Sequence, residues 1–361
     1  MIEKLRALLE EFCLTPGLSG HEHRIRKVVE KHLEPQSCDT DRLGNLWTTI
    51  EGVPDLPSVL VFAHMDQVGF VVRKIEANGF IRLECVGDVP ERSLPSQAVI
   101  LCTKNGDIPG LIGQKSRREA DPDAKCPTTS CRDLYVDAGF LNKSTAEAAG
   151  VKIGTPIVYR PDFMRMQGAR VAGTAIDDRA GCAALVLLAE RLLTRKSGPT
   201  VHIAFTTQKE LNLRGVLPLV NWLTPDIAIQ IDQMLSSDTP DTHDTGDMRL
   251  GKGPALSLYS FHELGTLNGL IPHPALVDLF EASAKATKTN LQRCAQTGIL
   301  TDSSIVQFQG DGVACIDVGF PMRYSHSSLE VCDLGDVATL IEVLDQALTR
   351  VDASFDMTSG R

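Results

Sequence analysis

A regular alternation of helical and strand-like segments begins after Gly173. Apolar strand-like runs cover residues 200–207, 226–231 and 313–318, and helical patterns cover residues 177–193, 213–223, 273–289 and 334–351. Because this alternation is typical of a sheet with helices packed on both faces, the sequence predicts an α/β fold. The earlier run Ser58–Ala63 (SVLVFA) has the composition of a further buried strand of the same sheet.

Residues 71–170 have a different pattern from the rest of the chain. They consist of short alternating segments separated by turn signals, such as EANGFIRL and GVKIGTPIVYR. This spacing is typical of a small β-rich unit. We therefore expect residues 1–70 and 171–361 to form one α/β domain, into which residues 71–170 are inserted. The polar stretch 116–130, SRREADPDAKCPTTS, is predicted to be a loop of the insert.

Charge and composition exclude several classes of protein. The 361-residue chain has a net charge of −10 and a pI near 5.4, so it lacks the basic balance typical of a nucleic-acid-binding protein. No apolar run reaches the roughly 18 residues of a membrane helix, and Glu3, Glu10 and Glu11 interrupt the N-terminal segment where a signal peptide would be apolar. The ten cysteines are scattered without a CxxC pair. We expect them to be reduced and the protein to be cytoplasmic.

Potential metal ligands stand at the ends of the predicted strands. They are His64 after SVLVFA, Glu210 after HIAFTT, Asp232 after DIAIQI, His326 shortly after CIDVGFP, and Asp177 at the start of a helix. Ligands of α/β proteins gather beyond the carboxyl ends of the strands. Histidine and carboxylate donors placed there are suited to one or two divalent metal ions.

Each of these residues, taken singly, also has a purely structural interpretation. A lone histidine at a strand end is more often structural than a ligand. Asp177 and Asp178 could cap the helix that follows them, and Asp232 could be an ordinary loop carboxylate. Five such donors at the ends of separate buried elements nevertheless favour one shared site.

Seven sequence blocks resemble a known family in their order and spacing. The blocks are TPGLSGHE, DRLGNL, AHMDQVGF, AIDDRAGC, TTQKELNLRG, LGKGPAL and YSHSSLE. They resemble the glutamyl/deblocking aminopeptidase family of dinuclear metallopeptidases, whose members form tetrahedral (TET) assemblies. The resemblance implies a mixed sheet of the zinc-peptidase type, a peptide substrate and an insert that forms a barrel-like dimerisation domain. It also implies a homo-oligomer, either a dimer building block or a dodecamer.

The resemblance assigns a role to each candidate residue. His64 and Asp232 would bind one metal ion, Glu210 and His326 would bind a second, and Asp177 would bridge the two. Asp66 would orient the imidazole of His64, and the peptide bond between Asp177 and Asp178 would be cis. The two divalent ions would be zinc or cobalt, with manganese as a third choice, because the ligand set does not distinguish them.

One catalytic position departs from the family pattern. Relatives have Gln-Glu-Glu where this chain has Gln208-Lys209-Glu210. The first glutamate of that pair is the family's general base, which moves a proton from the attacking water to the leaving amine. Lys209 therefore replaces the base, while the ligand Glu210 is retained. Gln67 replaces a usual glutamate and Asn212 a usual glycine nearby.

Several functions remain open at this point. The protein could be an aminopeptidase with reduced activity, because loss of a general base costs about 10²–10⁴-fold in rate. Lys209 could itself be the base if two nearby dications lowered its pKa. The protein could instead bind metal or peptide, or only assemble, without catalysis, or it could hydrolyse another small amide. A carboxypeptidase would need a cation for the substrate carboxylate, and Arg323 is the obvious candidate besides Lys209.

Overall fold

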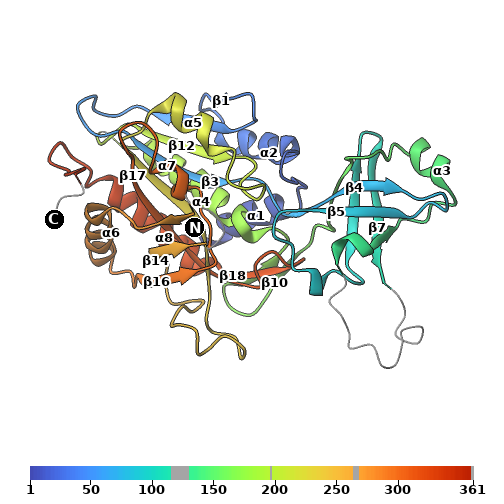
Figure 1. Cartoon of the computed structure of the whole chain (residues 1–361). Helices are drawn as coiled ribbons and strands as arrows, with labels where there is room; N and C mark the ends of the chain where they lie inside the picture. Colours follow the sequence, from blue (N-terminus) through green and yellow to red (C-terminus); the bar gives the residue numbers. More distant parts are fainter. Residues whose placement is uncertain (115–129, 196, 263–267, 359–361) are drawn as a thin grey trace.

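The computed structural model describes residues 1–114, 130–195, 197–262 and 268–358. A large mixed sheet with helices on both faces forms one part of the molecule, and a small closed barrel stands beside it (Figure 1). The predicted α/β fold with an inserted β-rich unit is confirmed.

The centre of the large sheet is built from the apolar runs that the sequence predicted to be strands. β12 (Val201–Thr206), β3 (Val59–His64), β13 (Ile227–Leu235) and β17 (Ala314–Arg323) lie side by side and parallel in this order. Antiparallel strands extend the sheet on both sides: β2 (Leu46–Ile50) and β1 (Asp39–Thr40) beyond β12, and β18 (Glu330–Asp333), β11 (Arg170–Gly173) and β10 (Phe163–Arg165) beyond β17. Strands buried on both faces need continuous apolar sequence, as these central runs have.

Helices cover both faces of this sheet and bury alternate residues of each central strand. One face packs against α1 (Ile2–Cys13), α2 (His23–Leu33), α4 (Ile176–Leu192), α6 (Pro274–Thr287) and α8 (Leu334–Leu348). The opposite face packs against α5 (Val216–Leu223) and α7 (Ser303–Val306). In β3, Val59 and Val61 face the first layer, whereas Leu60 and Phe62 face the second. None of the helices in the described part of the chain combines the length and apolarity needed to cross a membrane.

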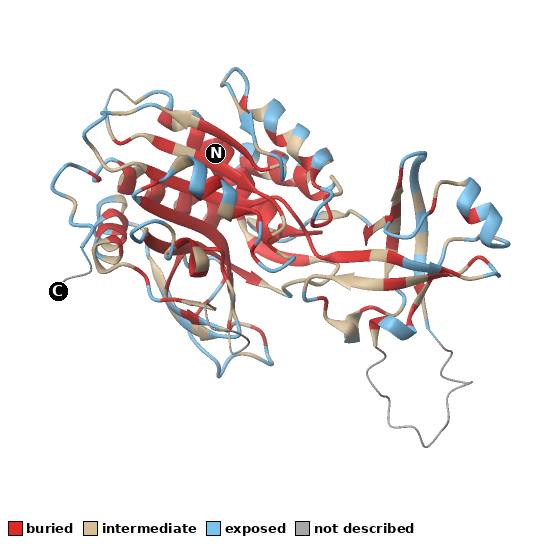
Figure 2. Cartoon of the chain, turned by 45° about the horizontal axis from the view of Figure 1, so that its top comes forward, coloured by how far each residue is buried: buried red, intermediate tan, exposed pale blue. Residues whose placement is uncertain are grey.

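The barrel has its own apolar core, separate from that of the sheet (Figure 2). It closes in the order β4 (Gly69–Ile75), β5 (Ile81–Val86), β8 (Tyr135–Asp137), β7 (Gly106–Gly113), β6 (Ala98–Thr103) and β9 (Pro156–Tyr159), and it carries η1 (Glu91–Ser93), η3 (Cys131–Asp133) and α3 (Lys143–Ala148). The barrel strands thus lie between Gly69 and Tyr159, while β10 and β11 belong to the large sheet. The loop predicted at 116–130 lies, except for Ser130, outside the described residues.

Two features of the fold differ from the sequence analysis. Residues 255–297 contribute β14 (Ala255–Phe261), β15 (Gly269–Leu270) and β16 (Gln292–Thr297), none of which was predicted; β14 pairs with β17. The expectation that the cysteines are reduced is wrong for Cys85 and Cys131, which form a disulfide. The barrel brings β5 against η3, so two cysteines that are 46 residues apart meet. The cysteine content therefore no longer supports a cytoplasmic location.

Candidate functional site

The five predicted donors meet at one edge of the large sheet. His64 ends β3, Glu210 follows β12, Asp232 lies in the second half of β13, and His326 follows β17. Because these strands are parallel, their carboxyl ends lie at the same edge. Asp177, in the first turn of α4, completes the cluster.

The donors form two overlapping groups that share Asp177. The first, called here the His64 group, consists of His64, Asp177 and Asp232, and the second, the His326 group, consists of Asp177, Glu210 and His326. Within each group the potential ligand atoms lie within 4.8 Å of one another. The Nε2 atom of His64 lies 3.0 Å from Asp177 Oδ1. The Nε2 atom of His326 lies 3.3 Å from Asp177 Oδ2 and 3.4 Å from Glu210 Oε2.

The donor set fits a divalent metal ion. Asp177 is buried, and its Oδ2 atom accepts no hydrogen bond from the described residues. A buried carboxylate oxygen without a hydrogen-bond donor is unfavourable unless a cation faces it. Imidazole nitrogen and carboxylate oxygen are ligands that zinc and related divalent ions take in proteins.

Both imidazole rings are held with Nε2 toward the cluster. The Nδ1 atom of His326 lies 2.8 Å from the main-chain oxygen of Asp88. The Nδ1 atom of His64 lies 3.2 Å from the main-chain oxygen of Asp66 and 3.5 Å from its carboxylate. A proton on Nδ1 that is donated to these oxygens leaves Nε2 free to bind a metal.

Each carboxylate oxygen of Asp66 accepts a main-chain N–H from the segment that carries Lys209 and Glu210. Its Oδ1 atom accepts the main-chain N–H of Lys209 at 3.0 Å, and its Oδ2 atom accepts that of Glu210 at 2.9 Å. Ser19 also donates its hydroxyl to Oδ2 at 2.8 Å. Asp66 therefore fixes the backbone of this segment as well as facing the His64 ring.

Glu330 is a positioning residue whose role the sequence analysis missed. It is buried in β18, where its Oε2 atom accepts the main-chain N–H of Asp177 at 2.9 Å and its Oε1 atom accepts that of His326 at 2.6 Å. Burial, reinforced by the charge of Asp177, raises the pKa of Glu330 to about 8. Its place in the YSHSSLE block was the available signal, but only the fold shows that it bridges two donors.

Lys209 points its ammonium group into the cluster. Its Nζ atom lies 3.1 Å from Glu210 Oε1, 3.4 Å from Asp232 Oδ2 and 3.9 Å from Asp177 Oδ1. Burial lowers the pKa of Lys209, but these three carboxylates outweigh burial and hold the pKa well above its usual range. With the carboxylates alone around it, Lys209 is a cation and cannot accept a proton.

The neighbouring sequence departures have local structural reasons. Gln67 is buried, and its Oε1 atom accepts the main-chain N–H of Gly17 at 3.1 Å, which ties the segment between β3 and β4 to the N-terminal turn. Asn212 has φ 70°, a left-handed conformation that asparagine tolerates better than most residues other than glycine. The peptide bond between Asp177 and Asp178 is cis, as the resemblance implied. Arg323 is occupied by Asp238 through two hydrogen bonds of 2.7 Å each.

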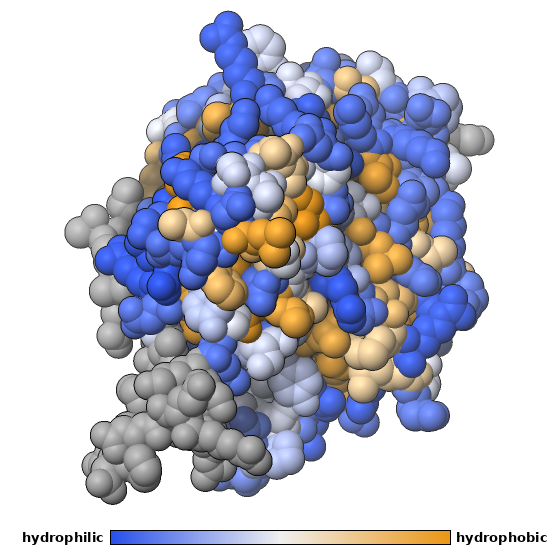
Figure 3. Space-filling model, turned by 90° about the vertical axis from the view of Figure 1, so that its right-hand side faces the viewer, coloured by the Kyte–Doolittle hydropathy of each residue, from blue (hydrophilic) through white to orange (hydrophobic). Residues whose placement is uncertain are grey.

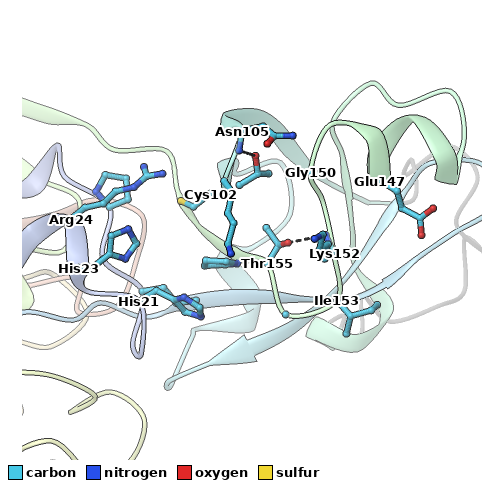
Figure 4. A pocket seen from close by; sticks show the side chains of 17 residues that line it. His21, His23, Arg24, Cys102, Asn105, Glu147, Gly150, Lys152, Ile153 and Thr155 are labelled. Atoms are coloured by element: carbon cyan, nitrogen blue, oxygen red, sulfur yellow. Dashed lines mark hydrogen bonds between the residues drawn. The ribbon is translucent and has the colours of Figure 1, made fainter. Parts of the chain in front are cut away.

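Two cavities are candidates for the position of the functional site. A cavity of about 580 Å³ lies between the start of α2 and the barrel, with His21 and Arg24 on one side and Asn105 and Thr155 on the other (Figure 4). It contains none of the five donors, and its Arg24 is paired with Asp107 at 2.7 Å. A cavity of about 10 Å³ lies against the His326 group. We place the functional site at the smaller cavity because the metal-type donors converge there.

The chain is similar to proteins of one family over most of its length. The sequence pattern of the M42 glutamyl aminopeptidases matches residues 44–343. The Escherichia coli protein SgcX is 35% identical over 332 residues, which cover 91% of this chain and 89% of SgcX. Lysyl aminopeptidase of Pyrococcus furiosus is 30% identical over 348 residues, which cover 93% of this chain and 94% of that protein.

Solved structures show the same fold. An aminopeptidase from the archaeon Desulfurococcus kamchatkensis has a TM-score of 0.91 and 26% identity, covering 98% of this chain and 97% of its own. The TET1 peptidase of Pyrococcus horikoshii, which can assemble into a tetrahedron or a large octahedral shell, has a TM-score of 0.84 and 27% identity. That match covers 96% of this chain and 99% of the peptidase.

Proposed function

This chain belongs to the M42 glutamyl aminopeptidase family, and from that membership we propose that it is a metal-dependent hydrolase that removes N-terminal residues from peptides. The observation that carries the proposal is the convergence of five donors at one sheet edge: His64, Asp177, Glu210, Asp232 and His326. Membership of the family implies divalent metal ions.

The two donor groups would hold the metal. Each group offers three donors, so the cluster has ligands for up to two ions that share Asp177, as the family pattern implies. The nitrogen and oxygen donors suit zinc, cobalt and manganese alike. A bound ion would polarise the scissile carbonyl and lower the pKa of the attacking water.

The side chain at 209 sets the expected rate. Lys209 is buried among three carboxylates that stabilise its charged form, and it lacks the carboxylate with which a glutamate would accept the proton there. Loss of a general base typically costs about 10²–10⁴-fold. We therefore propose an aminopeptidase whose rate is reduced by this amount.

The Lys209 ammonium group also favours a second function, which is binding without hydrolysis. A protein that binds metal or peptide without hydrolysis would keep the donors and lose the base, which is the arrangement found here. A carboxypeptidase has less support, because the Arg323 guanidinium that could hold a substrate carboxylate is already paired with Asp238.

Restoring the glutamate tests the proposal. We expect the wild type, purified with zinc, cobalt or manganese, to hydrolyse aminoacyl-anilides slowly, and Lys209→Glu to raise the rate by about 10²–10⁴-fold. A wild-type rate indistinguishable from that of the uncatalysed reaction, with a large gain in Lys209→Glu, would favour the binding function instead. Strong wild-type activity that Lys209→Glu fails to increase would contradict the assigned role of position 209.

Blocking the substrate amine tests the substrate class. An aminopeptidase should hydrolyse a peptide with a free amine and leave the N-acetylated peptide intact. Preferential hydrolysis of the acetylated peptide, or of a small acylated amine, would show a hydrolase of another amide.

We also propose that the protein is a homo-oligomer that assembles in part through the barrel, with residues 71–170 as its dimerisation domain. The TET1 peptidase assembles into closed shells, and this chain shares its fold over nearly its whole length. On the barrel, Leu141 and Ile153 are 85% and 67% exposed, and hydrophobic residues lie among hydrophilic ones on this end of the molecule (Figure 3). Light scattering after gel filtration would measure the assembly, and a monomer at micromolar concentration would refute it.

A further inference from the structure

The carboxylates of the His64 group already have internal partners. Asp232 accepts the side-chain amide of Gln230 on Oδ2 at 3.0 Å and the main-chain N–H of Gln233 on Oδ1 at 2.8 Å. Gln230 is itself fixed, because its Oε1 atom accepts the main-chain N–H of Ser303 at 2.8 Å. Both oxygens of Asp232 are thus engaged without any metal ion.

The ammonium group of Lys209 lies beside the carboxylate of Asp232. The Lys209 ammonium lies 3.4 Å from Asp232 Oδ2 and 3.9 Å from Asp177 Oδ1, besides its 3.1 Å hydrogen bond to Glu210 Oε1, and its side chain is 8% exposed. A buried ammonium group needs paired negative charge. A dication bound between His64 and Asp232 would remove that charge from Lys209 and repel it at close range.

The His326 group shares the Lys209 contact, because Glu210 Oε1 accepts a hydrogen bond from Lys209 Nζ at 3.1 Å, but its other donor atoms are not engaged in the same way. The buried Asp177 Oδ2 atom accepts no hydrogen bond from the described residues. It faces His326 Nε2, and Glu210 presents its own Oε2 atom to the same nitrogen. The small cavity at the cluster is lined by Asp177, Glu210 and His326, and its volume of about 10 Å³ suits one small guest. Lys209, His64 and Asp232 do not line it.

We propose that the protein holds one divalent ion per chain, at the His326 group, and that the Lys209 ammonium takes the place of a second cation at the His64 group. This proposal rests on the proposed metal-dependent function of the site. Lysine at position 209 would then have two effects. It removes the general base, and it reduces the number of bound metal ions from two to one.

Counting bound metal tests the proposal independently of catalysis. The full-length protein would be stripped with a chelator, loaded with zinc, desalted and measured by elemental analysis, and the zinc titration would be followed by calorimetry. We expect one zinc ion per chain for the wild type and two for Lys209→Glu. Lys285→Glu provides a matched control, since it makes the same charge change at an exposed position of α6 and should keep one ion.

A second variant guards against misfolding of Lys209→Glu. Lys209→Met removes the ammonium without adding a charge and should also bind a second ion, more weakly than Lys209→Glu does. Two zinc ions in the wild type, or one in all four proteins, would overturn the replacement of a metal by Lys209 while leaving the metal-dependent function intact. No zinc in any of the four would overturn both.

Discussion

The two halves of the site use the same kinds of donor yet differ in what surrounds them. In the His64 group both carboxylate oxygens of Asp232 accept hydrogen bonds, from Gln230 and Gln233, and the Lys209 ammonium, which also contacts Glu210, lies 3.4 Å from Oδ2. In the His326 group a carboxylate oxygen of Asp177 accepts no hydrogen bond from the described residues, and a cavity lies against it. On the one-ion proposal, the ligand residues do not by themselves fix the number of metal ions, because the neighbouring cation and amides also decide it.

The largest expected effect on zinc affinity comes from one of two isosteric substitutions, made one in each donor group so that the groups can be compared. Glu210→Gln removes a charged donor from the His326 group, and we expect zinc affinity to fall by more than about 100-fold, since the group has three donors. Asp232→Asn changes the His64 group in the same way and should lower the affinity by less than about 10-fold. Calorimetric titration of both variants measures this difference, and equal losses would show that both halves bind the ion.

Substitution of Glu330 should have the next largest effect on zinc affinity. Glu330→Gln replaces a carboxylate oxygen that accepts a main-chain N–H with an NH₂ group that cannot accept it, which loosens either Asp177 or His326. Loss of such a supporting partner typically costs about 10–100-fold in metal affinity. The same zinc titration measures the change. An unaltered affinity would mean that Glu330 does not position these donors for binding.

Substitution of Gln230 should have the smallest effect on zinc affinity and a clear effect on the free energy of unfolding. Gln230→Met leaves the main-chain N–H of Ser303 without its acceptor and removes a hydrogen bond to Asp232. We expect the free energy of unfolding to fall by about 1–3 kcal/mol and zinc affinity to stay within about threefold of the wild type. Urea denaturation and zinc titration measure the two quantities. A large loss of zinc affinity would place the ion beside Asp232 instead.

The sequence predicted the features that depend on local pattern. The apolar runs that became β3, β12, β13 and β17 are continuous because these strands are buried on both faces. Parallel strands then bring residues at their carboxyl ends to one edge, so the convergence of His64, Glu210, Asp232 and His326 could be anticipated from their positions.

Features that depend on long-range packing could not be predicted in this way. The disulfide joins residues 46 apart that meet only when the barrel closes, and Glu330 reaches Asp177 from a strand 153 residues away. The family resemblance implied that Lys209 replaces a base, but not that its ammonium faces Asp232. Asp66 holds the backbone of Lys209 and Glu210, and the ammonium of Lys209 then lies among the carboxylates of Asp177, Glu210 and Asp232.

Anomalous scattering from crystals grown with excess zinc would test the one-ion account most directly. We predict one anomalous peak per chain, beside Asp177, Glu210 and His326, with the Lys209 ammonium still next to Asp232. Two peaks on either side of Asp177, with Lys209 displaced from Asp232, would contradict the account.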